Sequence, residues 1–340
     1  KNYKVISLKD LSADLQSLPI IISGLHFRYY KRILKSLNIS NYYDADFLFN
    51  ELDLSNMDTA WTQERCKIQL DLYNFSVKSS RESKKLNLNS LDIVLTEKCS
   101  LKCKDCSNLM QYYAKPVDED FNTLVDSLDK FMKAVDYVQE LRIIGGEPFM
   151  YKKINEVLKI ITGYKNFGNL LVYTNGTIVP KEDKISSFKG DNVVFKISNY
   201  GSISRNVKKL EEFLKKNEIN YITENVTKWQ DCAKIQKYER DLSLTKEIFG
   251  NCLVNDALTL LHGNLYLCPY SAHGENLNAF PKEKNDSINL LANLDTATFK
   301  EKIRSLVFDK EYLKACNWCN GRDHNVAKID AAIQTKKPLE

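Results

Sequence analysis

The cysteines of this chain fall mainly into two spaced groups, and the first group has the pattern of a reactive metal site. It consists of Cys99, Cys103 and Cys106, which follow the spacing C-x3-C-x2-C. Three thiolates close together suit an iron–sulfur cluster or a zinc ion. With only three ligands from the protein, one iron of a 4Fe–4S cluster stays open to a small chelating molecule. The spacing therefore predicts a site that performs chemistry, since a purely structural site is closed by protein ligands.

The second group contains four cysteines. Its members are Cys252, Cys268, Cys316 and Cys319. Four thiolates satisfy a fully protein-ligated 4Fe–4S cluster, and a tetrahedral zinc ion needs the same number. From the spacing alone, both alternatives stay open. Cys66 and Cys232 are left over, and we expect Cys66 to be a small buried side chain.

The elements that position the first group follow an alternating pattern of strands and helices from Leu91 onward. The predicted strands cover residues 91–96, 140–144, 169–174, 193–198 and 219–223. The predicted helices cover residues 118–135, 151–163, 181–188 and 205–216. Such βα repetition is typical of a parallel sheet that carries its chemistry at the carboxyl ends of the strands. The first cysteine group comes directly after the first of these strands, as that rule requires.

Three segments are predicted along the chain. Residues 1–85 form a small α/β N-terminal unit, with a buried strand over 18–24, a helix over 27–37 and a polar linker over 79–85. Its strand–helix pattern resembles part of a nucleotide-sugar module. Residues 86–248 hold the βα repeats, and residues 249–340 hold the second cysteine group. We classify the fold as α/β.

A second motif follows the second predicted strand, and together with the cysteines it resembles a known family. The segment reads Gly145-Gly146-Glu147-Pro148. This combination is similar to the radical S-adenosylmethionine superfamily. The resemblance implies a partial (β/α)6 TIM-like barrel over 86–248. It also implies that the open iron binds the amino and carboxylate groups of S-adenosylmethionine. An electron from the cluster then breaks the C5'–S bond to give methionine and a 5'-deoxyadenosyl radical.

The same resemblance implies a set of cofactor contacts. The segment Gly145, Gly146, Glu147 and Pro148 is similar to the element that meets the methionyl amino group. Glycines allow close backbone approach and Glu147 can accept from an ammonium. Asn175, Ser198 and Asn199 resemble positions that meet the ribose and the carboxylate, although Asn175 before Gly176 is also a turn signal. Asp105 stands where the family usually has an aromatic, so we expect adenine packing to come from elsewhere.

The second cysteine group resembles the twitch extension of some members of this family. Ten residues, Gly263 and four more residues separate Cys252 from Cys268, and a distant C-x2-C follows. This order implies an auxiliary 4Fe–4S cluster in residues 249–340. It is similar to the aminocyclitol dehydrogenase of butirosin biosynthesis, in which hydrogen abstraction is followed by loss of a proton and an electron to give a ketone. The resemblance covers about residues 88–325.

Three residues are candidates for steering the reaction after hydrogen abstraction. Cys232 follows the fifth predicted strand and could return a hydrogen atom, or could be a buried thiol without a role. Arg205 could bind an anion or assist deprotonation, or could be a solvated arginine at a helix start. Asp231 could act as a base, or could be a solvated surface residue. For His262 and His273, beside the second cysteine group, packing or surface roles are favoured.

Composition narrows the function class. The net charge of +5 arises from 49 Lys and Arg against 44 Asp and Glu, which does not favour nucleic acid as a partner. No apolar run approaches the roughly 20 residues of a membrane span and no signal peptide is visible, so we expect a cytoplasmic protein without a membrane partner. The chain begins at Lys1 and not at a methionine, which suggests that residues ahead of it were removed or lie outside this sequence.

The first hypothesis is an enzyme that dehydrogenates or epimerises a small hydroxyl-rich substrate, such as a sugar, a sugar nucleotide or an aminocyclitol. Its predicted cofactors are two 4Fe–4S clusters and S-adenosylmethionine, and its electron donor would be a flavodoxin or ferredoxin. One alternative is a peptide-modifying maturase of the same family. Another is a non-catalytic zinc-binding protein.

Overall fold

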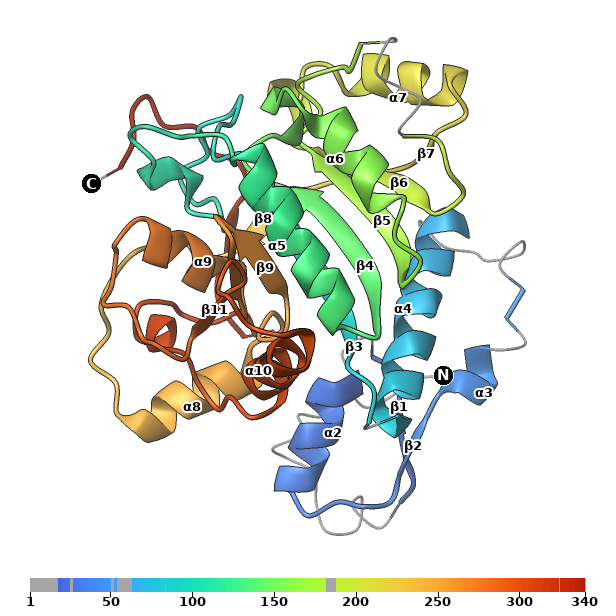
Figure 1. The fold of residues 1–340 in the computed structure, drawn as a ribbon, viewed down its shortest axis with the longest axis vertical. Coiled ribbons are helices and arrows are strands. Elements are labelled where there is room, and N and C mark those ends of the chain that lie inside the picture. Colours follow the sequence, from blue (N-terminus) through green and yellow to red (C-terminus); the bar gives the residue numbers. More distant parts are fainter. Residues whose placement is uncertain are drawn as a thin grey trace. The chain divides into compact units, whose positions relative to one another are not determined.

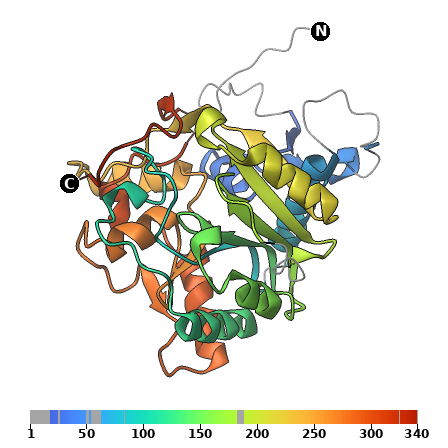
Figure 2. The same ribbon diagram turned by 90° about the horizontal axis from the view of Figure 1, so that it is seen from above.

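The computed structural model describes residues 18–24, 27–49, 52–53, 63–82, 84–181, 188–323 and 325–339. The chain divides into two compact units, Lys1–Ser83 and Lys84–Glu340. Figures 1 and 2 show the ribbon in two orientations. The proposed site lies entirely in the second unit.

The N-terminal unit is built on a small parallel sheet of two strands, β1 (Ile20–Ile22) and β2 (Tyr42–Asp44). The helices are α2 (Phe27–Ser36), α3 (Asp46–Phe49) and α4 (Gln63–Arg81). Tyr73 is part of the hydrophobic core of this unit. Its hydroxyl donates to the Ile22 carbonyl and accepts from the Ala45 amide. The predicted buried strand is only partly buried, because Ile21 is 47% exposed in this two-stranded sheet. The first part of the predicted linker is helical, since α4 continues to Arg81.

The second unit is organised on an eight-stranded sheet with the order β11-β10-β9-β3-β4-β5-β6-β7. The strands are β3 (Asn87–Val94), β4 (Tyr137–Ile144), β5 (Phe167–Thr174), β6 (Val193–Asn199), β7 (Asn220–Asn225), β9 (Leu258–Leu261), β10 (Asn264–Tyr266) and β11 (Ser287–Asn289). Strands β9 and β3 to β7 run parallel, and β10 and β11 are antiparallel to their neighbours. The parallel α/β sheet is confirmed. Its sixth parallel strand, β9, lies beside β3 and not beyond β7.

Because β9 to β11 belong to this same sheet, the predicted boundary between residues 248 and 249 does not separate two sheets. The expectation that 249–340 forms a domain of its own stays a prediction. The rest of this segment contains α8 (Leu242–Asn251), α9 (Pro269–Asn276), α10 (Thr296–Phe308) and the short strand β12 (Lys328–Asp330). Strand β12 pairs antiparallel with β8 (Lys228–Gln230), which follows β7 in the sequence.

The helices α5 (Phe121–Ala134), α6 (Ile154–Ile161) and α7 (Val207–Lys216) correspond to three of the predicted helices. The α5 helix begins where the Asp120 carboxylate accepts from the Thr123 amide at 2.8 Å, which satisfies a backbone donor of the first turn. The fourth predicted helix, over 181–188, lies mostly outside the described residues.

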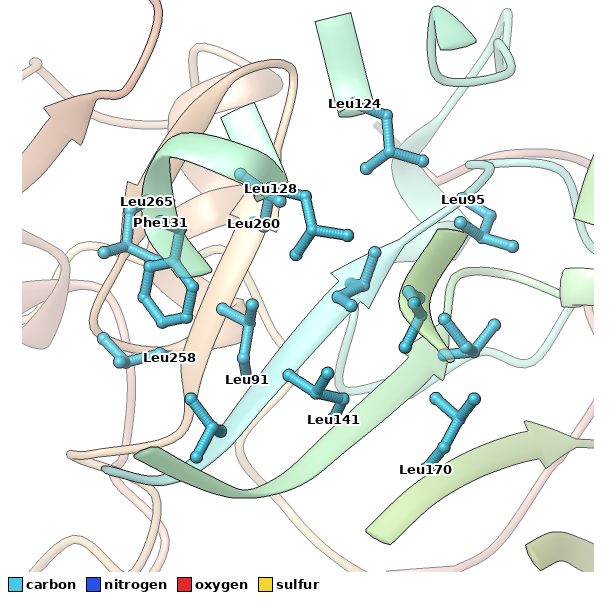
Figure 3. Packing of buried hydrophobic residues seen from close by; sticks show 14 of the residues in the cluster. Leu91, Leu95, Leu124, Leu128, Phe131, Leu141, Leu170, Leu258, Leu260 and Leu265 are labelled. Atoms are coloured by element: carbon cyan, nitrogen blue, oxygen red, sulfur yellow. The ribbon is translucent and has the colours of Figure 1, made fainter. Parts of the chain in front are cut away.

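The main hydrophobic core lies between α5 and the sheet. Figure 3 shows Leu124, Leu128 and Phe131 of α5 packed near leucines of β3, β4, β9 and β10. Because side chains alternate across a strand, Leu91 and Ile93 of β3 enter this core while Asp92 between them faces the other side of the sheet. That second face is available for polar chemistry. Within the described ranges, none of the helices combines the length and apolarity that crossing a lipid bilayer requires.

Candidate active site and cluster sites

The first cysteine group lies on the loop that leaves β3, at the carboxyl edge of the sheet. Cys99, Cys103 and Cys106 line one cavity of about 220 Å³. Backbone atoms of residues 145 and 146 border the same cavity, as do side chains that follow β5 and β6. Burial raises the pKa of the Cys103 thiol to about 11, against an opposing hydrogen bond from Gln334. A metal must therefore displace protons from these thiols when it binds.

The glycines after β4 are required by close packing against the cysteine loop. A Cβ atom on Gly146 would lie 2.3 Å from the Lys98 carbonyl oxygen and 2.7 Å from the Cys99 Cβ. A Cβ on Gly145 would lie 2.5 Å from the Thr96 carbonyl oxygen. The Gly146 amide donates to that Thr96 oxygen at 2.9 Å. These contacts join the ends of β3 and β4, and this cradle fits a cluster held between them.

The side chain of Glu147 ties the end of β4 to the end of β5. It is fully buried, and its carboxylate accepts from the Thr174 hydroxyl at 2.9 Å and from the Asn175 amide at 2.9 Å. Burial raises its pKa to about 7, while these hydrogen bonds oppose the rise. Glu147 is not one of the residues that line the cavity, whereas Pro148 is. Its predicted contact with an amino group stays a prediction.

The other predicted cofactor residues take different positions. Asn175 and Ser198 both line the cavity, and the Asn175 side-chain amide donates to the Ser100 hydroxyl at 3.1 Å. The Asn175 Oδ1 also accepts from the Thr177 amide at 3.0 Å, so its turn role is present as well. Asn199 instead donates to the exposed Asn225 side chain at 2.8 Å.

Two aromatic side chains complete the cavity wall, and the sequence reasoning missed them. Tyr200 and Trp229 both line it, and their rings meet edge to face at 5.5 Å. Tyr200 directly follows β6. An aromatic residue at the end of a predicted strand was therefore the sequence feature that could have identified it. Trp229 lies on β8, which the sequence pattern did not predict. The two rings provide a flat apolar surface against which a ligand ring can pack, and the Asp105 side chain cannot provide such a surface.

The C-terminal segment runs along the cysteine loop. The Lys104 amide donates to the Ile333 carbonyl at 2.7 Å, and the Thr335 amide donates to the Lys102 carbonyl at 2.7 Å. Between these bonds, the side chain of Gln334 accepts from the Lys102 amide at 2.8 Å and donates to the Cys103 Sγ at 3.2 Å. The segment therefore fixes the loop and places a hydrogen-bond donor on a ligand sulfur.

Replacing Gln334 by glutamate should make the reduction potential of a cluster on this loop more negative. Glutamate keeps the acceptor for Lys102 but loses the donor to Cys103, and hydrogen bonds to cluster sulfurs stabilise the reduced, more negative state. The measurement is a redox titration followed by electron paramagnetic resonance, with Thr335→Val as the control. An unchanged midpoint potential in Gln334→Glu would contradict this role.

The four cysteines of the second group line a separate cavity. Its volume is about 40 Å³, whereas one buried water needs roughly 10–15 Å³. The space among the cysteines is therefore larger than a site for a single water. The cavity wall contains Cys252, Cys268, Cys316 and Cys319. Within the described part of the chain, no three His, Cys, Asp or Glu side chains are drawn together around a single point as ligands of one metal ion. The cysteines instead surround a cavity, and this donor set fits a fully ligated cluster.

The structure gives the three candidates for steering the reaction different surroundings. Cys232 lines the second cavity, and its Sγ accepts from the Arg322 Nε at 3.2 Å. Asp231 forms an ion pair with Lys234 at 2.9 Å, and Arg205 is exposed. Their predicted roles as hydrogen donor, base and anion ligand stay predictions.

A buried ion-pair network anchors the cysteine loop to the β9–β10 turn. The His262 ring contacts Glu119 Oε2 at 2.9 Å and Glu97 Oε1 at 3.0 Å. Hydrogen bonds that the His262 ring donates to Glu119 and then to Glu97 raise the pKa of His262 to about 10. Burial lowers the pKa of His273 to about 4, and its ring meets the Tyr113 hydroxyl at 2.9 Å. His262 is therefore charged and His273 neutral at physiological pH.

Comparison with known proteins agrees with this geometry. A family described as "4Fe-4S single cluster domain" matches residues 92–194, which contain the three-cysteine loop and the glycine segment. The chain is 29% identical to GTP 3',8-cyclase of Campylobacter jejuni over 94 residues, covering 27% of this chain and 29% of that protein. The enzyme of Clostridium acetobutylicum is 24% identical over 151 residues, 44% of either chain. The matches therefore span less than half the length of these relatives.

Two solved structures are also similar. One is BtrN in complex with AdoMet and 2-DOIA, with 15% identity, a TM-score of 0.40 and coverage of 74% of this chain and 97% of that chain. The other is anSMEcpe with bound AdoMet, with 12% identity, a TM-score of 0.45 and coverage of 75% and 92%.

The match over residues 92–194 agrees with the expected resemblance to the radical S-adenosylmethionine superfamily. The cysteine loop and the glycine segment are the residues that carry this resemblance. The cofactors of such enzymes are S-adenosylmethionine and a 4Fe–4S cluster, and the three cysteines that would hold this cluster line the cavity at the carboxyl edge of the sheet. The second cavity has the ligands for the second 4Fe–4S cluster.

Proposed function

We propose that this protein abstracts a hydrogen atom from a small hydroxyl-rich substrate, and that dehydrogenation or epimerisation follows. The substrate would be a sugar, a sugar nucleotide or an aminocyclitol. When bound, the cluster on Cys99, Cys103 and Cys106 and the S-adenosylmethionine supply the 5'-deoxyadenosyl radical. The observation that carries the substrate class is a row of charged side chains on the sheet face next to the cavity.

The row of charged side chains begins on β4, next to a residue that lines the cavity. Ile144 of β4 lines the cavity, and Arg142, two residues earlier, therefore points to the same face of the sheet. The Arg142 Nε donates to Glu140 at 2.8 Å, and its Nη1 lies 3.7 Å from Asp92 Oδ1 on β3. Further along the same face, the Lys196 Nζ contacts Glu224 at 3.0 Å. These charged side chains pair with one another and make this face of the sheet polar, which suits a hydroxyl-rich substrate better than an apolar one.

Asp92 is the member of this row best suited to bind a hydroxyl or amino group. It is 8% exposed, and its Oδ1 has no hydrogen-bond partner within the described residues. Burial raises its pKa to about 6, and the neighbouring Arg142 opposes this rise. An acceptor oxygen that is buried and lacks a hydrogen bond gains most from a donor on a ligand.

The remaining residues follow from this arrangement as proposals. Gly145, Gly146, Glu147 and Pro148 would position the methionyl end of S-adenosylmethionine, and Asn175, Ser198 and Asn199 its ribose and carboxylate. Tyr200 and Trp229 would pack against the adenine. A fully ligated second cluster would accept the electron in a dehydrogenation, and a flavodoxin or ferredoxin in the cytoplasm would reduce the first cluster.

The test uses the anaerobically reconstituted protein with reductant, S-adenosylmethionine and a panel of aminocyclitols, hexoses, nucleotide sugars and GTP. We expect 5'-deoxyadenosine to form and one class of polyol to increase its formation. In deuterated water, an epimerised product carries one non-exchangeable deuterium, whereas a ketone product carries none from this step. Stimulation by a peptide but by no member of the panel would favour a maturase. Stoichiometric zinc without iron would overturn the whole assignment.

A further inference from the structure

One arginine holds the turn that carries the last two cysteines of the second group. Arg240 lies just before α8, and its Nη1 donates to the Cys316 carbonyl oxygen at 2.9 Å and to the Cys319 carbonyl oxygen at 2.7 Å. Its Nη2 donates to the Asn320 side chain at 3.2 Å. The guanidinium therefore contacts the backbone of both cysteines and the side chain of the residue that follows them.

The two residues between these cysteines are held by neutral donors. The Asn317 carbonyl accepts from the Tyr238 amide at 2.8 Å, and the Trp318 carbonyl accepts from the Tyr270 hydroxyl at 2.6 Å. Neutral groups are thus sufficient to satisfy carbonyl oxygens of this turn. The cation is placed at the two predicted ligand residues, so the need for a hydrogen bond does not by itself account for an arginine at this position.

Arg240 brings its positive charge to the cysteines without a carboxylate partner. Among the described residues it forms no ion pair, and its hydrogen bonds go to neutral oxygens. The Tyr238 ring packs against the guanidinium, with its centroid 4.0 Å from the Arg240 Cζ, which holds the charged group in place. Lys310 lines the same open cavity as Arg240, but it is paired with Asp286 at 2.6 Å. The charge of Arg240 is therefore not cancelled by an adjacent anion.

A cation beside a 4Fe–4S cluster favours the reduced state of the cluster. Reduction adds one negative charge, and the potential depends on the net charge and the hydrogen bonds around the cluster. The guanidinium carries a permanent positive charge. Because Arg240 is only partly exposed, solvent screens this charge less than it screens a charge on the open surface.

We propose that Arg240 is a positioning residue of the second cluster, which fixes the backbone of Cys316 and Cys319 and makes the cluster easier to reduce. Reduction adds one electron to the cluster and leaves its four thiolate ligands in place. In the proposed dehydrogenation, the substrate radical loses a proton and gives this electron to the second cluster, and Arg240 stabilises it there. Only this last consequence rests on the proposed function.

The test is a redox titration, followed by electron paramagnetic resonance, of the reconstituted full chain in a Cys103→Ala background. This background leaves only the four-cysteine group able to hold a complete cluster, so one signal is measured. Arg240→Gln keeps hydrogen-bond donors but removes the charge. At a fixed potential its ratio of reduced to oxidised cluster should fall at least about tenfold, which corresponds to a midpoint about 59 mV more negative.

Two further variants separate the charge from the shape of the turn. Arg240→Lys keeps the charge and should keep the midpoint potential of the unchanged background. Lys237→Gln is the matched control, because it removes one charge from an exposed side chain of the same segment, and it should also leave the potential unchanged. Iron content should stay at about four per chain in all of these proteins.

An Arg240→Gln midpoint equal to that of Lys237→Gln would overturn the proposal, since the charge would then have no effect on the cluster. An equally negative midpoint in Arg240→Lys would also overturn it, because the shape of the turn would then set the potential. If Arg240→Gln binds less iron, Arg240→Lys decides. About four irons with the background potential would support the role of the charge, and loss of iron there as well would contradict it. Both readouts are independent of turnover, so they do not depend on the proposed substrate.

Discussion

Replacement of Cys103 by alanine is expected to abolish the formation of 5'-deoxyadenosine. With Cys99 and Cys106 alone, the loop cannot hold a 4Fe–4S cluster with one open iron, and the electron that breaks the C5'–S bond has no source. Activity should fall below detection, which for a typical assay means at least about a thousandfold, or about 4 kcal/mol of barrier. Iron content should fall from about eight to about four per chain. The measurement combines chromatographic detection of 5'-deoxyadenosine with iron analysis.

Cys66→Ala is the matched control for this experiment. Cys66 is also a buried cysteine, at 5% exposure, but it lies on α4 of the N-terminal unit. Its replacement removes a thiol without touching either cysteine group, so both iron content and 5'-deoxyadenosine formation should stay unchanged. Retained activity in Cys103→Ala would mean that this loop is not the site of S-adenosylmethionine cleavage.

The sequence predicted those features that are encoded locally. The five core strands appear within four residues of their predicted bounds, because each contains a short apolar run between turn or helix signals. The cysteine loop and the glycine segment could be found because their spacing is fixed over a few residues. The glycines were expected to approach a ligand. The structure shows that they also pack against Thr96 and Lys98 of the cysteine loop.

The features that the sequence did not reveal depend on contacts between distant residues. Gln334 and Cys103 are 231 positions apart, and no local pattern connects an amide near the end of the chain to a cysteine loop. Arg322 and Cys232 are 90 positions apart and meet only because the chain returns along β8 after the second cavity. Asp92 was hidden for a different reason. It is a polar residue between the apolar Leu91 and Ile93, and its role depends on which face of the sheet borders the cavity.

Replacement of His262 by alanine is expected to destabilise the main unit by about 3–5 kcal/mol, the usual cost of removing one partner from a buried ion pair. The variant leaves Glu97 and Glu119, which are 4% and 2% exposed at their side chains, without their shared cation. For a unit of this size the thermal midpoint should fall by roughly 6–20 °C. Lys98→Ala, which removes only a more exposed pair with Asp118 on the same loop, should cost at most about 1 kcal/mol.

The same histidine predicts how stability depends on pH. Its pKa rises from an ordinary value of 6.5 in the unfolded chain to about 10 in the folded state, so the folded state binds the proton more tightly. Its contribution is therefore complete below about pH 6.5 and is lost progressively as the pH rises toward 10. Unfolding of the metal-free protein, measured at intervals across that window, should show a declining stability that is nearly absent in His262→Ala. A parallel decline in both proteins would show that His262 is not its source. The loop that carries Cys99 would then be held by the backbone contacts with Gly146 and Glu147 and not by this ion pair.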